Sequence, residues 1–219
     1  MTRRVLVLLA FAAVLVTPGS RVISAAEPTR EEALAALADT RDVDNRRRGA
    51  MALAETGVMA DVPKLAAALR DDDALVRKLA ERAMWEVWSR SGDASVDRLL
   101  ASGIEQMGAR EGELAVRTFT EVIRRRPDFA EGWNKRATVY YLMGEYQKSL
   151  ADCDEVMKRN PYHFGALSGY GMIYLQLDQP AKALDYFQRA QKVNPNLESV
   201  NETVEMLKPL LIQRRKDTI

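Results

Sequence analysis

Residues 130–163 read AEGWNKRATVYYLMGEYQKSLADCDEVMKRNPYH, and the same pattern occurs in the preceding segment 96–129 and in the following segment 164–197. The matching positions are Pro127, Pro161 and Pro195; Leu99, Trp133 and Leu167; Gln106, Tyr140 and Tyr174; Gly103, Ala137 and Gly171; Ala115, Ser149 and Ala183; Phe119, Cys153 and Phe187; and Val122, Val156 and Ala190. Seven columns agree over three copies without a gap, which chance explains poorly. The chain therefore carries three repeats of equal length, at 96–129, 130–163 and 164–197.

The spacing of these columns predicts helices. Within a copy the columns lie at helical spacings of three, four and seven, which places their side chains on one helix face. The shared proline ends the second helix of each copy, because a proline inside a helix removes a hydrogen bond. Pro180 suits the first turn of another helix, where its missing N–H is harmless. One helix pair cannot bury its own apolar face, whereas three stacked pairs can. We therefore expect an all-α fold, an α-solenoid of stacked antiparallel helix pairs.

The repeat resembles the tetratricopeptide repeat, a helix–turn–helix unit of the same length. The middle copy carries the fullest set of matching residues: Trp133, Ala137, Tyr140, Gly144, Tyr146 and Pro161. The third copy keeps Gly171, Tyr174, Ala183, Phe187, Ala190 and Pro195. The first copy departs from the pattern, with Leu99 in place of the early aromatic residue and Gln106 in place of the tyrosine. Residues 198–219 would form a C-terminal capping helix over the last repeat, and we expect Pro209 to kink or shorten it.

Residues 27–93 also read as helical, with a shorter unit. Two stretches rich in alanine and leucine are each followed by an aspartate and then an arginine: Ala33 to Leu37 precede Asp42 and Arg47, and Leu65 to Leu69 precede Asp72 and Arg77. The aspartates would cap the N-termini of helices, and Pro63 fits a first turn. This arrangement resembles a pair of short HEAT-type repeats; a generic pair of helical hairpins is the alternative. We place the boundary between the two halves at 91–93.

The N-terminal segment 1–26 has the features of a signal peptide. Arg3 and Arg4 form a basic start, and 5–16 is an apolar run that ends before Pro18 and Gly19. Small residues at 24–26 suit cleavage by a signal peptidase. The apolar run is shorter than the roughly 20 residues that a spanning helix needs. We expect a periplasmic or secreted protein of the bacterial envelope, without a membrane span after cleavage; an uncleaved anchor or a buried N-terminal helix is the alternative.

The composition excludes several classes of site. The chain has 219 residues with 32 Lys plus Arg against 31 Asp plus Glu, so it has no global attraction for nucleic acid, and we expect none as a partner. The arginine runs at 46–48 and 124–126 read as solvated helix faces. A single histidine and a single cysteine exclude a disulfide framework and a Cys/His zinc site. Phosphate-binding loops and metalloprotease or serine-hydrolase motifs are absent from the sequence. We therefore expect no catalytic residues, no metal and no cofactor.

The cysteine, the histidine and a pair of tryptophans have a structural interpretation. Cys153 shares its column with Phe119 and Phe187, so we expect a core thiol. His163 follows Pro161 at the junction of two repeats, so a turn histidine is the better interpretation than a metal ligand. Trp85 and Trp88 lie about one turn apart; we expect them to pack against the first repeat, and a binding hot spot is the alternative.

The resemblance to tetratricopeptide repeats implies that the first helix of each unit lines a concave groove. The corresponding residues are Leu100, Ile104 and Met107, then Asn134, Thr138 and Tyr141, then Ser168, Met172 and Leu175. None of the nine is charged and five are aliphatic or Met, which favours an apolar or amphipathic helical segment as the ligand. Coverage of this stripe by the N-terminal half, or by a second copy of the chain, is the alternative.

Three hypotheses about function follow from these features. The first is a non-catalytic periplasmic adaptor or scaffold that holds an envelope protein or peptide in its groove. The second is an accessory subunit or enzyme acting on a cell-wall or small-molecule substrate. It would need a deep pocket with several converging carboxylates or aromatic residues, near Trp85 and Trp88. The third is a self-associating structural protein, whose partner is a second copy of the chain.

Overall fold

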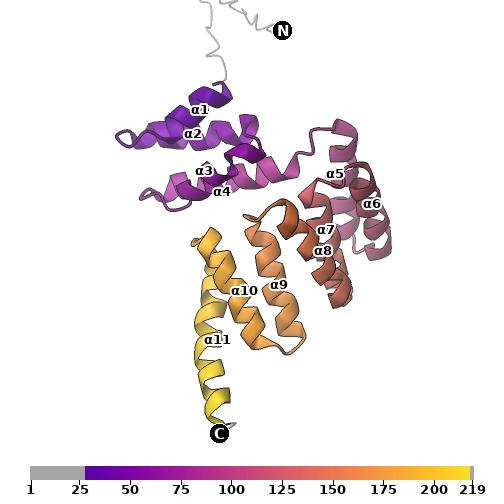
Figure 1. Cartoon of the computed structure of the whole chain (residues 1–219). Helices are drawn as coiled ribbons and strands as arrows, with labels where there is room; N and C mark the ends of the chain where they lie inside the picture. The colour runs from indigo at the N-terminus through magenta and orange to yellow at the C-terminus, as the bar shows by residue number, and fades with distance from the viewer. Residues whose placement is uncertain (1–27, 218–219) are drawn as a thin grey trace, which may run out of the picture.

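The computed structural model describes residues 28–217, and within that range it contains helices and no strand (Figure 1). The elements in chain order are α1 (Arg30–Leu37), α2 (Val43–Thr56), the short 3-10 helix η1 (Met59–Asp61), α3 (Val62–Ala68), α4 (Ala74–Ser89), α5 (Ala94–Gly108), α6 (Gly112–Arg125), α7 (Ala130–Leu142), α8 (Tyr146–Arg159), α9 (Phe164–Gln176), α10 (Pro180–Val193) and α11 (Glu198–Asp217). Helix pairs follow one another in an arc, with α1–α4 at the top of Figure 1 and α11 below. The expected all-α solenoid is confirmed.

The repeat prolines act where the sequence predicts. The second helices α6, α8 and α10 end shortly before Pro127, Pro161 and Pro195, at Arg125, Arg159 and Val193. Pro180 is the first residue of α10, a position that needs no backbone donor. Pro209 does not shorten the last helix, because α11 continues past it to Asp217, and the kink at this residue stays a prediction.

In each repeat a small side chain of the first helix lies in the same core cluster as, or directly against, a larger side chain of the second helix. In the outer repeats the small residue is glycine and the partner is phenylalanine. A Cβ placed on Gly103 would lie 2.5 Å from the ring of Phe119, and one on Gly171 would lie 2.5 Å from the ring of Phe187. In the middle repeat the same two columns hold Ala137 and Cys153. The middle repeat therefore has the smaller pair of side chains at this contact.

The N-terminal half consists of the helix pairs α1–α2 and α3–α4, which arginine–aspartate ion pairs link. Asp42 caps α2 as predicted, but the cap of α4 is Asp73 and not Asp72. Arg47 donates to Asp73 at 2.6 and 3.0 Å, while Arg46 donates to Asp71 at 2.7 and 3.0 Å. Arg46 is largely buried, so its interpretation as part of a solvated helix face is wrong. The likeness to HEAT-type repeats stays a prediction.

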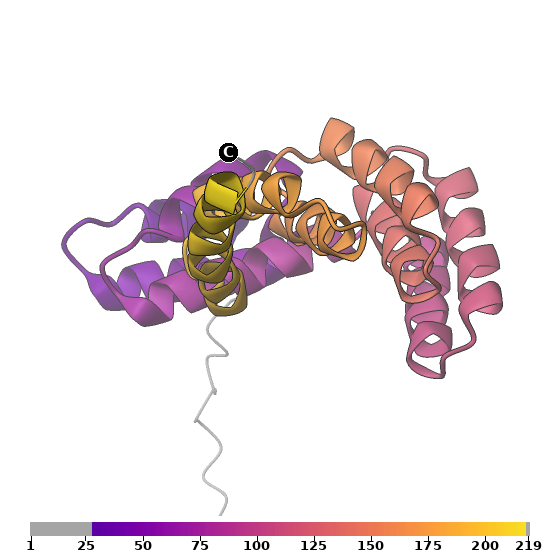
Figure 2. The same cartoon turned by 90° about the horizontal axis from the view of Figure 1, so that it is seen from below.

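The N-terminal half contacts the turns between repeats. Figure 2 shows the molecule from below, with α11 in front of the N-terminal helices. Trp88 stacks on His163 with ring centroids 4.5 Å apart, and both tryptophans contact Phe164. Asn196 donates to the Leu69 carbonyl at 2.8 Å, and this bond ties the last turn to α3. Packing of the tryptophan pair is thus confirmed, but its partner is the junction of the second and third repeats and not the first repeat. The packing partner of an aromatic pair depends on which elements lie beside it in the fold, and a sequence period does not predict this.

The predicted signal peptide, 1–26, lies outside the described residues. Within 28–217, no helix has the length and apolar character needed to cross a bilayer.

Candidate functional site

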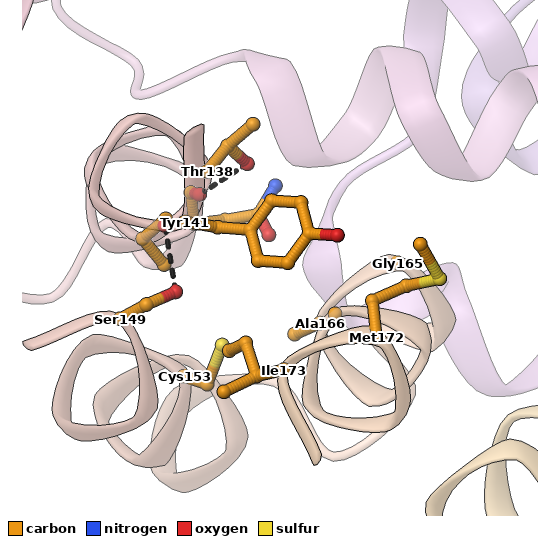
Figure 3. Close-up of a pocket in the computed structure, with 11 residues that line it drawn as sticks. Thr138, Tyr141, Ser149, Cys153, Gly165, Ala166, Met172 and Ile173 are labelled. Atoms are coloured by element: carbon orange, nitrogen blue, oxygen red, sulfur yellow. Dashed lines mark hydrogen bonds between the residues drawn. The ribbon is translucent and has the colours of Figure 1, made fainter. Parts of the chain in front are cut away.

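A cavity of about 120 Å³ lies between α7, α8 and α9 and opens to solvent (Figure 3). Its lining residues are Asn134, Ala137, Thr138 and Tyr141 from α7; Ser149 and Cys153 from α8; and Gly165, Ala166, Gly169, Met172 and Ile173 from α9. The ring of Tyr141 projects over the space, with Cys153 and Ile173 beneath it in this view. The cavity thus joins the second repeat to the first helix of the third.

The cavity has a direct cause in the sequence. Cys153 occupies the column where Phe119 and Phe187 fill the contact with the facing helix in the outer repeats. A thiol is smaller than a phenyl ring, and the extra methyl of Ala137 relative to glycine replaces only part of that volume. The smaller pair of side chains therefore leaves room at the solvent-exposed groove between α7, α8 and α9.

The lining is uncharged, and its polar groups mostly bond within the protein. Ser149 Oγ donates to the Ala137 carbonyl at 2.7 Å, and Thr138 Oγ1 donates to the Asn134 carbonyl at 2.9 Å. Cys153 is 2% exposed, and burial, with Asp152 and Asp154 nearby, raises the pKa of its thiol to about 12. The thiol therefore stays neutral at physiological pH, and the cavity presents apolar surface to a ligand.

Four of the nine predicted groove residues line the cavity: Asn134, Thr138, Tyr141 and Met172. The other five do not. Leu100 is 4% exposed and Met107 packs beside it, so both belong to the core of the first repeat. Leu175 packs against the core formed by the third repeat and α11, Ser168 bonds to the Phe164 carbonyl, and Ile104 is exposed. Their assignment to the partner groove stays a prediction without support from the cavity.

Seven lining residues were missed, because the resemblance pointed only to one stripe of the first helices. They are Ala137, Ser149, Cys153, Gly165, Ala166, Gly169 and Ile173. The available signal was the column Phe119, Cys153 and Phe187, in which only the middle copy has a small side chain. Cys153 is a core residue, as predicted, and it is also the base of a cavity.

A buried polar network supports the cavity wall. Asn134 Nδ2 donates to Glu131 Oε2 at 3.1 Å, and His163 Nε2 lies 2.9 Å from the same oxygen. His163 Nδ1 accepts the Ala166 N–H, so in the neutral ring the proton is on Nε2 and is donated to Glu131. Lys135 Nζ lies 2.9 Å from Glu131 Oε1. Burial raises the pKa of Glu131, but the interactions with His163 and Lys135 outweigh it and hold the pKa below the ordinary value.

His163 is therefore a turn residue with a structural role. It caps α9 through Nδ1, and its side chain is completely buried between Trp88 and Glu131. Among residues 28–217, no group of three His, Cys, Asp or Glu side chains could hold a metal ion. Both His163 and Glu131 are buried, and Trp88 stacks on the histidine ring.

The comparisons with known proteins concern the repeat half. Residues 128–195 match the family model described as tetratricopeptide repeat. A TPR repeat-containing protein of Rhizobium etli is 33% identical over 128 residues, which are 58% of this chain and 63% of that relative. The chain thus spans less than two thirds of the relative's length.

Two solved structures share the fold. The Sgt2 TPR domain from Aspergillus fumigatus has a TM-score of 0.53 at 17% identity, and the match covers 57% of this chain and 83% of that one. The first TPR domain of Spaghetti (RPAP3), bound to an HSP90 peptide, has a TM-score of 0.52 at 17% identity, with coverage of 55% and 96%. At this identity the likeness concerns the fold alone. Together with the regular sequence period and the helix pairs α7–α8 and α9–α10, the family match means that the chain contains tetratricopeptide repeats, at residues 128–195.

Proposed function

We propose that this chain is a non-catalytic adaptor that binds an apolar or amphipathic helical segment of a protein partner, with one apolar side chain of the partner seated in the cavity beside Cys153. The observation that carries the proposal is the open, uncharged cavity at the one repeat whose small-to-large contact is relaxed. A neutral thiol, Ala137 and Ile173 offer apolar contact, and burying an apolar side chain there is favourable by roughly 25 cal/mol per Å².

The position of the N-terminal half supports an accessible groove. Its contacts include the turns at Tyr162–Phe164 and Val193–Asn196, and none of its residues lines the cavity. Trp85 comes close at Gly165, where a Cβ would lie 2.7 Å from its ring, so α4 borders one end of the groove. A helical segment lying in the groove would then run from Met172 toward Trp85.

The proposal includes a cellular location for the adaptor, and two other functions compete with it. We place the adaptor in the periplasm or outside the cell, on the basis of the signal-peptide features of residues 1–26. An enzyme or accessory subunit would need a deep pocket with several converging carboxylates or aromatic residues near Trp85 and Trp88. A second cavity, at Trp88, is lined by one carboxylate, Asp128, and by the rings of Trp88 and Phe129. A self-associating protein would use a second copy as the occupant of the groove.

Site-specific photocrosslinking tests the proposal directly. A photoreactive amino acid replaces Met172, which is 42% exposed at the cavity, in cells that export the protein. The same replacement at Met206, 68% exposed on α11, is the matched control. We expect a protein crosslink from position 172 that is missing from position 206. A crosslink to a second copy of the chain alone would favour self-association and contradict the adaptor.

A double variant separates binding from folding. Ala137→Gly with Cys153→Phe gives the middle repeat the pair that the outer repeats already use, so the ring should fill the cavity. We expect the variant to remain folded, with a midpoint of thermal unfolding no lower than that of the parent, and to lose the crosslink from Met172. A folded double variant that retained the crosslink would show that the partner does not use the cavity.

A further inference from the structure

A second cavity, of about 210 Å³, lies where the N-terminal half meets the turns of the repeats. Its walls come from η1, from the connection between α4 and α5, and from the two turns that follow α6 and α8. The lining residues are Met59, Trp88, Arg90, Ser91, Arg126, Asp128, Phe129, Ala130, Arg159 and Asn160. None of them lines the groove cavity.

Two buried N–H groups at this cavity lack a hydrogen-bond partner among the described residues. They are Nε1 of Trp88, whose residue is 3% exposed, and Nδ2 of Asn160, whose residue is 1% exposed. The orientation of the Asn160 amide follows from its other end, because Oδ1 accepts the Tyr162 N–H at 3.1 Å. A buried donor without a partner costs about 1–3 kcal/mol, so two such donors in the lining of one cavity favour an occupant that accepts hydrogen bonds.

Three guanidinium groups add charge and further donors. Arg90 donates to the Ala54 and Gly57 carbonyls, which fixes it across the end of α2. Arg126 holds the exposed Asp128 through Nε and Nη2 at 3.1 Å each, which leaves Nη1 outside this pair. Arg159 donates to the Pro127 carbonyl and to Glu155 through Nε and Nη1, which leaves Nη2.

The charged side chains that line the cavity are three arginines and one aspartate, and Glu155 pairs with Arg159 beside it. Other carboxylates lie near its rim. Asp97 accepts the Ser91 N–H at 2.8 Å, and Asp93 caps α5, so both are engaged by backbone donors. The remaining walls are apolar, formed by Met59, Phe129, Ala130 and the indole of Trp88. An occupant therefore has to combine an anionic, acceptor-only end with an apolar body.

We propose that this cavity binds the carboxylate of a small organic acid, with its apolar body against Met59 and Phe129. A carboxylate has two acceptor oxygens and no donor, which suits Trp88 Nε1, Asn160 Nδ2 and the free arms of Arg126 and Arg159. The contact between Arg126 and Asp128 already shows this guanidinium holding a carboxylate through two nitrogens. Because the site joins the two halves, an occupied cavity would tie α4 to the turns of the repeats.

The indole N–H signals of the protein provide a direct test. The chain has three tryptophans, so a nitrogen–proton NMR spectrum of the full protein contains three such signals, which Trp→Phe variants assign. Benzoate is titrated at constant ionic strength, with benzamide as the uncharged analogue and inorganic phosphate as the anion without an apolar body. We expect the Trp88 signal to move saturably with benzoate, and the benzamide titration to cause no such change.

Arg126→Gln supplies the matched variant, since Arg126 reaches the cavity and is not part of the core. Arg124→Gln, at the exposed end of the same helix, is its control. We expect Arg126→Gln to weaken benzoate binding at least about tenfold, in line with the loss of a charge-assisted hydrogen bond, and Arg124→Gln to leave it unchanged. A Trp88 signal that moves with phosphate but not benzoate would overturn the organic acid. A signal that responds to no anion, or equally in both variants, would overturn the site.

Discussion

The middle repeat and the third repeat have the same arrangement of two helices and the same sequence period, but different kinds of side chain form the contact between the two helices. In the third repeat Phe187 packs onto Gly171, and the neighbouring column stacks Tyr170 on Tyr186 with centroids 4.2 Å apart. In the middle repeat those columns hold Cys153 against Ala137 and an ion pair between Arg136 and Asp152. In the third repeat aromatic rings fill the contact between the helices. In the middle repeat an ion pair and two small side chains lie beside the cavity, so the candidate binding site arises where one repeat of a regular stack has different side chains.

The largest test of this difference is truncation of the two equivalent residues. Phe187→Ala should cost about 3–5 kcal/mol of the free energy of unfolding, because it removes a buried ring and leaves a cavity. Cys153→Ala should cost about 1 kcal/mol, since the site is already open and loses one sulfur atom. Urea denaturation of the two variants measures both values. Equal costs would mean that the middle and third repeats are packed alike, contrary to the structure.

The reactivity of Cys153 offers the next test. Its pKa of about 12, against an ordinary value of 9.0, leaves about a thousandfold less thiolate at neutral pH. Iodoacetamide should therefore alkylate the folded protein at least about a thousandfold more slowly than a short peptide containing an unperturbed cysteine. Because only the thiolate reacts, the rate should rise about tenfold per pH unit up to pH 11. Mass spectrometry follows the reaction; a rate that levels off near pH 9 would contradict the buried, neutral thiol.

The ion pair of the middle repeat gives a smaller effect. Arg136 donates to Asp152 at 2.8 Å through Nε and through Nη2, and the two side chains are 15% and 6% exposed. Asp152→Ala should cost about 2–3 kcal/mol, because it leaves a half-buried guanidinium without its partner. Replacing both residues with tyrosine, as in the third repeat, should recover most of this loss. Glu205→Ala, which removes an exposed ion pair with Lys208, is the control and should change stability little.

The sequence period predicted the helices well and the site only in part. Pro127, Pro161 and Pro195 act on their own helices, so their effect needs no knowledge of neighbours. The same period placed Leu100 of the first repeat and Asn134 of the middle repeat in the groove; both are buried, but of the two only Asn134 lines the cavity. A period assigns a face of a helix, whereas a cavity depends on the size of the side chain across from it.

The contacts of the N-terminal half were the least predictable. Trp88 and His163 lie far apart in the sequence, in different halves of the chain, and no periodicity links them. Arg46 and Arg47 read as part of a charged helix face, but they pair with Asp71 and Asp73, which lie between α3 and α4 of the next helix pair. Such long-range contacts depend on how two elements are placed relative to each other. Local sequence patterns do not give this placement, so they do not predict the contacts.

The smallest predicted effect tests whether the contact between Gly171 and Phe187, equivalent to Ala137 and Cys153 in the middle repeat, depends on both residues together. Gly171→Ala places a methyl group 2.5 Å from the Phe187 ring, so the buried ring has to move. Crowding of this kind typically costs about 1–3 kcal/mol, and alanine regains about 0.5–1 kcal/mol of helix propensity, so we expect a net loss of about 1 kcal/mol. In a Phe187→Cys background the same change should be neutral or stabilising, because the ring is gone. A double-mutant cycle in urea measures this coupling. If the two changes are additive, the ring and the glycine are independent, and the cavity of the middle repeat needs another cause than Cys153.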